Sequence, residues 1–365
     1  MNSTAIAKID LGALTHNLSL IRQKMPNQKI MAMVKSNAYG HGLVRVAQAI
    51  ADVNALGVAT IAEALQLKES GIQTDIVVMR GFSTEEALPP FFADPHLFAC
   101  IHDEKQVALL EEKKFELTKP LRIWLKVDTG MHRLGIPHEK LKVIYERLMA
   151  LPFIVKPFVI CSHLADADND DPHFTQQQIA CFDTLTSKMM EEKSLLNSAG
   201  ILAHPASHHD WIRPGLIVYG VSPFAQNSQY QTLMNGFKPV MTLESKLIAI
   251  KAIPAGEKIG YSCTFTAPRD MKIGVVGMGY GDSYPRHAKN GTPVLIRGER
   301  CPIVGRVSMD MITVDVSHLS DVEIDDTVIL WGEALSIAEI AHYVNTVPHE
   351  LLCHLTGRVQ TEYKI

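Results

Sequence analysis

The sequence predicts an α/β protein in which an N-terminal (β/α)8 TIM barrel precedes a mainly β C-terminal domain. Eight short apolar runs alternate with amphipathic segments over about 200 residues, which is the pattern of parallel barrel strands and their covering helices. Beyond about residue 235, the runs become short, β-rich and bounded by Gly and Pro turns, which indicates a separate β domain. The predicted domains are residues 1–232 and 233–365, and a doubly wound parallel sheet is the alternative for the first.

The individual elements follow from apolar spacing and capping residues. A strand is expected at about residues 4–9, where it could pair with the β domain, and Asp10 is a candidate N-cap for the next helix. The barrel strands are expected at residues 30–34, 55–59, 75–79, 97–101, 121–127, 158–162, 194–198 and 216–219. Spacers such as 63–70 and 103–115 are expected to be helices. The second domain should contain strands at 247–250, 271–276, 293–296 and 311–316, and one or two helices within 335–355.

Composition excludes several classes of protein. Hydrophobic residues make up 47% of the 365 residues, which is enough for a large core, and the net charge of −4 without basic blocks argues against nucleic acid or a membrane surface as a partner. Neither a signal peptide nor a membrane-spanning run is expected from the sequence. The six cysteines are scattered without a C-x-x-C pair, so we expect no disulfide framework, no metal site and a cytoplasmic protein.

One lysine stands where barrel enzymes carry their chemistry. The run Ile30–Val34 predicts a buried strand, Lys35 follows it directly, and the chain then turns through small residues and two glycines. Active sites of barrels lie at the C-terminal ends of the strands. An ammonium group is costly to hold in a dry site, so a lysine there is a candidate Schiff-base former. The alternative is a salt-bridged surface lysine.

The stretch around this lysine, AMVKSNAYGHG at residues 32–42, resembles the cofactor signature of alanine racemases, pyridoxal-phosphate (PLP) enzymes that interconvert L- and D-alanine. The resemblance continues along the chain, for example at residues 126–135, 279–286 and 305–311. It implies that Lys35 holds PLP and serves as the base on one face of the substrate. Tyr261 would be the base on the other face, contributed by the second subunit of a homodimer with shared active sites. D-Alanine for peptidoglycan would be the product.

The same resemblance implies the cofactor contacts. Arg213 would face the pyridine nitrogen of PLP, and because a guanidinium keeps its proton, that nitrogen would stay unprotonated. We hypothesise that the weaker electron sink suppresses transamination. The phosphate group would be bound by Tyr39, Ser198, Gly220 and Val221. A tyrosine base needs cationic neighbours near neutral pH, and the matching positions are Arg133 and His163.

Substrate recognition is implied for three further positions. Arg133 would bind the carboxylate, the backbone N–H of Met309 would come from the partner subunit, and Tyr280 would crowd the entrance so that only a small side chain fits. Lys126 matches a position that is N-carboxylated in several relatives, where the carbamate orients the arginine. An unmodified ammonium beside Arg133 would be repelled, so an anion or another pairing is expected there.

Two positions depart from the family pattern, and two other functions remain open. Ser283 stands where a glycine is common and would be strained if that glycine needs positive φ, and Gly357 stands where some relatives place a phosphate-binding tyrosine. One alternative is a broad-specificity racemase or a PLP-dependent decarboxylase of basic amino acids on the same two-domain plan. The other is a non-catalytic PLP-binding homeostasis protein, but those relatives lack the domain that carries Tyr261 and Met309.

Overall fold

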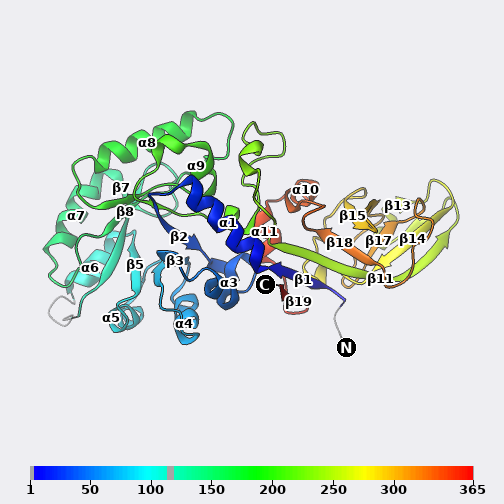
Figure 1. The fold of residues 1–365 in the computed structure, drawn as a ribbon, viewed down its shortest axis with the longest axis horizontal. Coiled ribbons are helices and arrows are strands. Elements are labelled where there is room, and N and C mark those ends of the chain that lie inside the picture. Colours follow the sequence, from blue (N-terminus) through cyan, green and yellow to red (C-terminus); the bar gives the residue numbers. More distant parts are fainter. Residues whose placement is uncertain (1–3, 113–118, 365) are drawn as a thin grey trace. The chain divides into compact units, whose positions relative to one another are not determined.

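The computed structural model describes residues 4–112 and 119–364. The chain forms two compact units (Figure 1). The barrel unit comprises Asn17–Val218 and Ser222–Gly236, and the β unit comprises Met1–His16, Tyr219–Val221 and Phe237–Ile365.

The barrel unit is a closed ring of eight parallel strands, which confirms the predicted fold. The strands follow the order β5-β4-β3-β2-β10-β9-β8-β6, and pairing of β5 with β6 closes the ring. The short β7 (Ile136–Pro137) extends β6. The barrel strands are β2 (Lys29–Met33), β3 (Ala55–Val58), β4 (Asp75–Val78), β5 (Leu97–Ile101), β6 (Arg122–Asp128), β8 (Val159–Cys161), β9 (Glu192–Ser194) and β10 (Trp211–Ile212).

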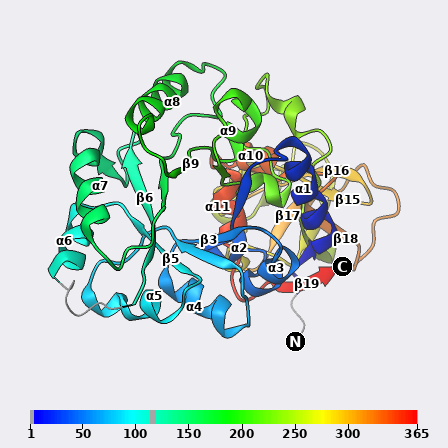
Figure 2. The same ribbon diagram turned by 60° about the vertical axis from the view of Figure 1, so that its left-hand side comes forward.

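Helices surround these strands (Figure 2). Helix α4 begins with a capping box, in which the Thr60 hydroxyl accepts from the Glu63 N–H and the Glu63 carboxylate accepts from the Thr60 N–H. Asp10 caps α1, because its Oδ1 accepts from the Ala13 N–H at 2.8 Å, as predicted. The helices of this part are α1 (Leu11–Lys24), α3 (Leu43–Ala49), α4 (Ile61–Glu69), α5 (Pro89–Ala93), α6 (Glu104–Glu112), α7 (Leu141–Ala150), α8 (His173–Thr186) and α9 (Ser198–Ala203). The last three residues of the helix expected at 103–115 lie outside the described residues.

The predicted position of the eighth strand is wrong, and the seventh is displaced. Residues Leu216–Tyr219 form a 3-10 helix, while the eighth strand is the two-residue Trp211–Ile212. All four residues of the 3-10 helix are buried, and a short run that is buried on every side has no periodicity to distinguish strand from helix. The seventh strand starts at the charged Glu192, and the expected range 194–198 runs instead into α9, which Asn197 caps.

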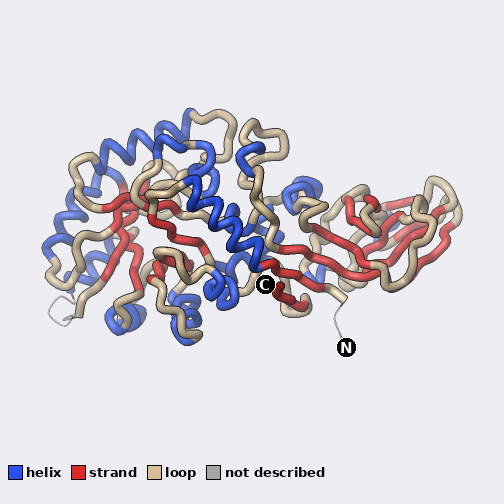
Figure 3. The backbone as a smooth tube through the Cα atoms, in the orientation of Figure 1, coloured by secondary structure: helices blue, strands red, loops and turns tan. Residues whose placement is uncertain are grey.

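The β unit is built on the long strand β11 (Met241–Ile253), and strands dominate it (Figure 3). The sheet order is β16-β15-β18-β11-β1-β19, with β14 paired to both β11 and β17. The N-terminal strand β1 (Ile6–Asp10) pairs antiparallel with β11 and parallel with β19. The other elements are β12 (Lys258–Ile259), β13 (Phe265–Thr266), β14 (Met271–Val276), β15 (Pro293–Ile296), β16 (Glu299–Pro302), β17 (Ile312–Asp315), β18 (Thr327–Trp331), α10 (Ile337–Tyr343), α11 (Pro348–Cys353) and β19 (Gln360–Lys364).

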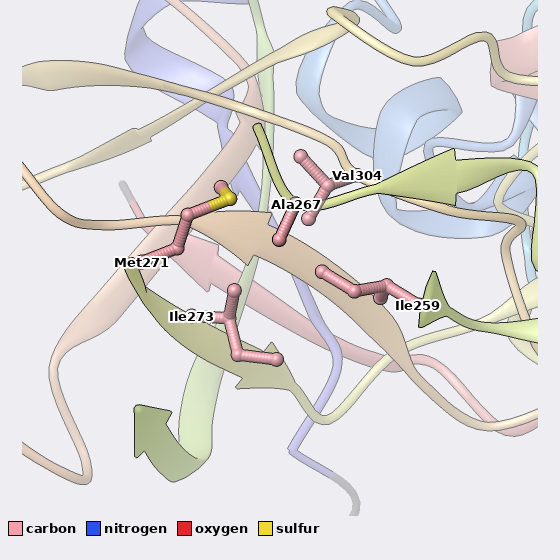
Figure 4. Close-up of a cluster of buried hydrophobic side chains, with 5 residues drawn as sticks. All are labelled: Ile259, Ala267, Met271, Ile273 and Val304. Carbon is pink, nitrogen blue, oxygen red and sulfur yellow. The ribbon is translucent and has the colours of Figure 1, made fainter. Parts of the chain in front are cut away.

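Part of the core of the β unit lies beside the hairpin of β12 and β13. Tyr261 lies in the segment that connects these two strands. Ile259, Ala267, Met271, Ile273 and Val304 form a buried apolar cluster (Figure 4). Because Ile259 stands two residues before Tyr261, this packing anchors the segment that carries the tyrosine. Within the described residues, no helix combines the length and apolar character that crossing a bilayer requires.

Candidate active site

Four of the predicted site residues of the barrel unit gather at the C-terminal ends of its strands. Lys35 follows β2, Lys126 lies near the end of β6, His163 follows β8 and Arg213 follows β10. The pKa of His163 lies well below its usual value, first because the ring is buried and then because Arg213, Lys126, Arg133 and Lys35 place positive charge around it. The fold therefore brings four cations to one imidazole.

The segment that carries Lys35 adopts an unusual backbone. The element labelled α2 (Lys35–Tyr39) is a left-handed turn, in which Ser36, Asn37, Ala38 and Tyr39 have φ between 51° and 55°. Such a conformation costs about 1–2 kcal/mol for each non-glycine residue. Gly40 (φ 77°) and Gly42 (φ 94°) accommodate the exit from the turn, which gives a physical reason for the two glycines of the motif.

Hydrogen bonds from three directions hold this turn in place. The Ser36 N–H donates to Glu63 Oε1 at 2.6 Å, and the Leu43 N–H donates to Asn37 Oδ1 at 2.8 Å. The Ala38 N–H donates to the Val34 carbonyl at 2.8 Å. Strained backbone persists only where the surroundings over-determine it, and such places cluster at functional sites.

Arg213 is buried and fixed by oxygen atoms of neutral groups. Its Nη1 donates to Ser194 Oγ at 2.6 Å, and its Nη2 donates to the carbonyl groups of Ser162 and Leu195. The same Nη2 lies 3.3 Å from Nδ1 of His163. Burial lowers the pKa of Arg213, yet a guanidinium stays protonated in proteins. The side chain is therefore a rigid positive charge at the centre of the barrel end.

Lys126 is a second buried cation. Burial lowers its pKa, and the positive charges of Arg213 and Arg133 act in the same direction, while the thiols of Cys161 and Cys100 oppose them. No ion pair joins Lys126 to a carboxylate among the described residues. A buried ammonium without a carboxylate is an incomplete arrangement, which fits the expectation of an additional anion at this place.

Two of the predicted phosphate ligands lie around Gly215. Ser198 Oγ accepts from the Gly215 N–H at 2.9 Å, and the Tyr39 hydroxyl lies so close that a Cβ on Gly215 would stand 2.7 Å from its oxygen. Gly220 and Val221 belong to the β unit, where a Cβ on Gly220 would stand 1.8 Å from the Lys238 carbonyl oxygen. Both glycines are thus required by close approach.

Sequence reasoning missed the residue that shapes the loop of Arg133. Oδ1 of Asp128 accepts from the N–H groups of Gly130 and His132, and Oδ2 lies 3.1 Å from Nδ1 of His132. Burial alone would raise the pKa of Asp128, but the two backbone donors bring it below its usual value. An aspartate followed two residues later by glycine is the signal that could have found this turn.

The β unit carries the remaining predicted residues on its surface. Tyr261 is 65% exposed and Met309 is 51% exposed, and Tyr280 is also exposed. The Tyr280 and Met309 segments are joined, because the Tyr280 N–H donates to the Ser308 carbonyl at 3.0 Å and the Gly281 N–H to the Met309 carbonyl at 2.8 Å. Ser283 has a φ of 85°, so the departure from glycine falls at a left-handed position as anticipated.

A cationic cavity in the β unit was not anticipated. It has a volume of about 770 Å³ and is lined by Thr264, Arg286, His287, Ala288, Lys289, Asn290, Gly305 and Arg306. The Arg286 guanidinium also lies 5.4 Å from the centre of the Tyr280 ring. In residues 4–112 and 119–364, no three His, Cys, Asp or Glu side chains are grouped closely enough to hold a metal ion.

A closed barrel with a lysine and other cations at the C-terminal ends of its strands, followed by a β domain, defines the class of two-domain barrel enzymes. Residues 9–223 match the profile of the alanine racemase N-terminal domain, and residues 240–363 match that of the alanine racemase C-terminal domain. The chain belongs to the alanine racemase family, which confirms the resemblance noted in the sequence and makes the protein an isomerase, an amino-acid racemase.

Individual relatives support this assignment over the whole length. The chain is 50% identical to an alanine racemase of Coxiella burnetii over 358 residues, which are 98% of both chains. It superposes on the biosynthetic alanine racemase of Pseudomonas aeruginosa with a TM-score of 0.94 at 37% identity, covering 100% of both chains. An alanine racemase of Bartonella henselae, described with covalently bound pyridoxal phosphate, matches with a TM-score of 0.88 at 28% identity over 99% of both chains.

Proposed function

We propose that this protein interconverts L- and D-alanine with PLP held on Lys35, and that the two bases are Lys35 and the partner subunit's Tyr261. The observation that carries the proposal is the gathering of Lys35, Lys126, His163 and Arg213 at the C-terminal ends of four barrel strands, with Nη2 of Arg213 3.3 Å from Nδ1 of His163. Family membership supports the reaction, and the exposed position of Tyr261 supports its use by a second subunit.

The residues at the barrel end fit an anionic cofactor such as PLP. Four cations surround His163, and the hydroxyl groups of Tyr39 and Ser198 flank Gly215, where the phosphate would be bound together with the backbone of Gly220 and Val221. When bound, PLP supplies the electron sink that makes the Cα–H bond of the amino acid acidic.

The two bases act on opposite faces of the substrate carbon. Racemisation removes a proton from one face and delivers a proton to the other, and a single fixed base cannot reach both. Lys35 Nζ would hold the proton on one side and the hydroxyl of the partner subunit's Tyr261 on the other. Arg133 would lower the cost of a phenolate on that tyrosine through its positive charge, and His163, whose ring stays neutral because its pKa is lowered, would act only as a hydrogen-bond partner.

Arg213 would limit how strongly the bound cofactor withdraws electrons from the substrate. Its guanidinium is fixed by Ser194, Ser162 and Leu195 and cannot donate its proton to the pyridine nitrogen. The uncharged nitrogen would leave the ring a weaker electron sink, which disfavours protonation on the cofactor and thereby transamination.

Three groups would bind and select the substrate. Arg133 would bind the carboxylate, the backbone N–H of the partner subunit's Met309 would assist, and Tyr280 would narrow the entrance. Large apolar side chains exposed together on a domain are typical of an interaction surface, which supports the homodimer. A carbamate on Lys126 would orient Arg133, and the lowered pKa of Lys126 favours the neutral amine that reacts with CO2.

D-Alanine made here would supply peptidoglycan synthesis in the cytoplasm, and the six cysteines, all free thiols, fit a reducing compartment. Residues 1–232 would be the PLP-binding domain and 233–365 the domain that carries the second base, with strand β1 paired into the latter.

The decisive experiment is complementation between two inactive chains. Lys35→Ala and Tyr261→Phe chains should each have little activity as homodimers. After equal mixing and exchange of subunits, half of the dimers are mixed and one of their two sites is intact, so about one quarter of wild-type D-alanine formation should return. If mixing restores nothing, the shared-site arrangement is wrong. Lysine, arginine and serine assayed beside alanine test the broad-specificity racemase and decarboxylase alternatives.

A further inference from the structure

Three segments that are distant in the sequence meet around Arg358 in the β unit. They are residues 279–283, which carry Tyr280, residues 308–311, which carry Met309, and residues 354–358, which link α11 to β19. Backbone hydrogen bonds join the first two segments at Tyr280–Ser308 and Gly281–Met309. The third segment contributes Arg358 itself.

Arg358 pairs with one carboxylate from each of the first two segments. Its Nε lies 3.0 Å from Oδ1 of Asp282, and its Nη2 lies 2.7 Å from Oδ1 of Asp310, the residue after Met309. Asp282 is buried, and its Oδ2 accepts from the Gly279 N–H at 2.9 Å. One guanidinium therefore bridges the turn of Tyr280 and the loop of Met309.

The surroundings fit the guanidinium closely. A Cβ on Gly281 would stand 2.5 Å from Nη1 of Arg358, so a larger residue there would push the guanidinium away from its present position. The Thr356 hydroxyl donates to the Gly281 carbonyl at 3.1 Å and accepts from the Arg358 N–H at 3.3 Å. The Ser283 hydroxyl donates to the His354 carbonyl. Contacts from the three residues that follow Tyr280 thus lead to the 354–358 segment.

We infer that Arg358 is a positioning residue for substrate binding: by bridging Asp282 and Asp310 it fixes the backbone N–H of Met309 relative to Tyr280. This inference rests on the proposed function, because it takes Met309 and Tyr280 as parts of the site. The pair with Asp310 is exposed on both sides and contributes little to stability, and the buried Asp282 keeps the Gly279 N–H as a hydrogen-bond donor when Arg358 is removed. Loss of Arg358 should therefore disturb the geometry of the site more than the stability of the fold.

The test compares Arg358→Ala with the matched control Arg300→Ala. Arg300 also lies in the β unit, and two of its nitrogens bind the carboxylate of Glu339. Its side chain is 55% exposed, and it does not bridge the segments of Tyr280 and Met309. The measurements are kcat and KM for alanine, the affinity for propionate, the melting temperature and the visible absorption of bound PLP. Propionate has the carboxylate and methyl group of alanine without the amine, so it reports carboxylate binding apart from turnover.

We expect Arg358→Ala to raise KM and the propionate dissociation constant about tenfold, because misplacement of a binding group by a fraction of an ångström has effects of this size. The kcat should fall much less, and the PLP absorption should stay unchanged because the bridge made by Arg358 involves none of the residues proposed to hold the cofactor. Arg300→Ala should leave all four quantities unchanged. Equal effects in the two variants, or an unchanged propionate affinity in Arg358→Ala, would overturn the inference.

A second pair of variants protects the test against a folding defect. Asp310→Asn weakens the same bridge while keeping the arginine, and should raise the propionate dissociation constant in the same direction. The double variant should be no worse than Arg358→Ala alone, since both changes break one bridge; additive effects would refute the bridge. Wild type in the same assay distinguishes a failure of the proposed function from a failure of this inference. If wild type does not racemise alanine, the proposed function fails. If wild type is active and Arg358→Ala behaves like it, only the role of Arg358 is refuted.

Discussion

The close approach of Gly215 to the Tyr39 hydroxyl gives a quantitative test of how the phosphate end of the site is built. In Gly215→Ala, the new Cβ would stand 2.7 Å from the hydroxyl oxygen, whereas ordinary contacts begin at 3.4 Å. The hydroxyl must therefore move by about 0.7 Å, the difference between these two distances. Tyr39 is buried, so the shift has to be absorbed by packed neighbours.

The expected cost follows from known overpacking effects. Forcing an extra carbon into a packed interior costs about 1–3 kcal/mol, offset by about 0.4–1 kcal/mol from the smaller freedom of alanine in the unfolded chain. Gly215 has no positive φ, so no backbone penalty is added. We expect Gly215→Ala to lower the free energy of unfolding by about 1–2 kcal/mol, and to weaken PLP binding about tenfold, the equivalent of one charge-assisted hydrogen bond.

Urea unfolding of four proteins tests this reasoning: wild type, Gly215→Ala, Tyr39→Phe and the double variant. Removal of the hydroxyl removes the obstacle, so Gly215→Ala should cost about 1–2 kcal/mol less in the Tyr39→Phe background. Gly357→Ala is the matched control, because a Cβ there meets nothing within 4 Å and the position has no positive φ. A cost of Gly215→Ala that is the same in both backgrounds would refute the steric account.

Three further predictions address other groups of the site. Arg213→Glu should increase the transamination half-reaction, measured by the conversion of bound PLP to its amine form in the presence of alanine; no gain would count against the role of the guanidinium. Burial lowers the pKa of His41 to about 4, so the unfolded chain binds a proton between about pH 6.5 and 4 that the folded chain does not, and stability is lost as the pH falls. This contributes about 2 kcal/mol between pH 7 and 5, and His41→Asn, which keeps a donor for the Ala38 and Tyr39 carbonyls, should flatten that dependence in urea unfolding. If Lys126 carries a carbamate, removal of CO2 should lower activity and bicarbonate should restore it in wild type but not in Lys126→Asn; indifference of the wild type to CO2 would exclude the modification.

The sequence was informative where a residue type and its place along a strand pointed to the same chemistry. Lys35 could be placed because an uninterrupted apolar run precedes it, and strand β2 does end two residues earlier. The eighth strand could not be placed, because Trp211–Ile212 is too short to show alternation while the nearby Leu216–Tyr219 is apolar throughout. Burial rather than strand geometry produced that apolar run.

The geometry within the site was less predictable than its residues. Nothing in Ser36-Asn37-Ala38-Tyr39 favours left-handed backbone in four successive residues, since only asparagine adopts it with any ease. Such a turn is decided by contacts from outside the segment, and sequence patterns report local preference only. The role of Asp128 could not be predicted for the same reason, because this residue acts through the hydrogen bonds that it accepts from the backbone of the following loop.

Glu63 shows how the fold sustains that unfavourable turn next to Lys35. Its Oε2 accepts from the N–H groups of Ala59 and Thr60 at the start of α4, and its Oε1 accepts from the Ser36 N–H at 2.6 Å. The bonds from Ala59 and Thr60 stabilise the start of α4. The bond from Ser36 uses the same carboxylate to hold the loop that follows β2. A residue that caps one βα unit thus holds the lysine turn of another. The strain beside Lys35 is therefore offset in part by a hydrogen bond from outside the turn, and the position of the lysine does not rest on the turn's own preference alone.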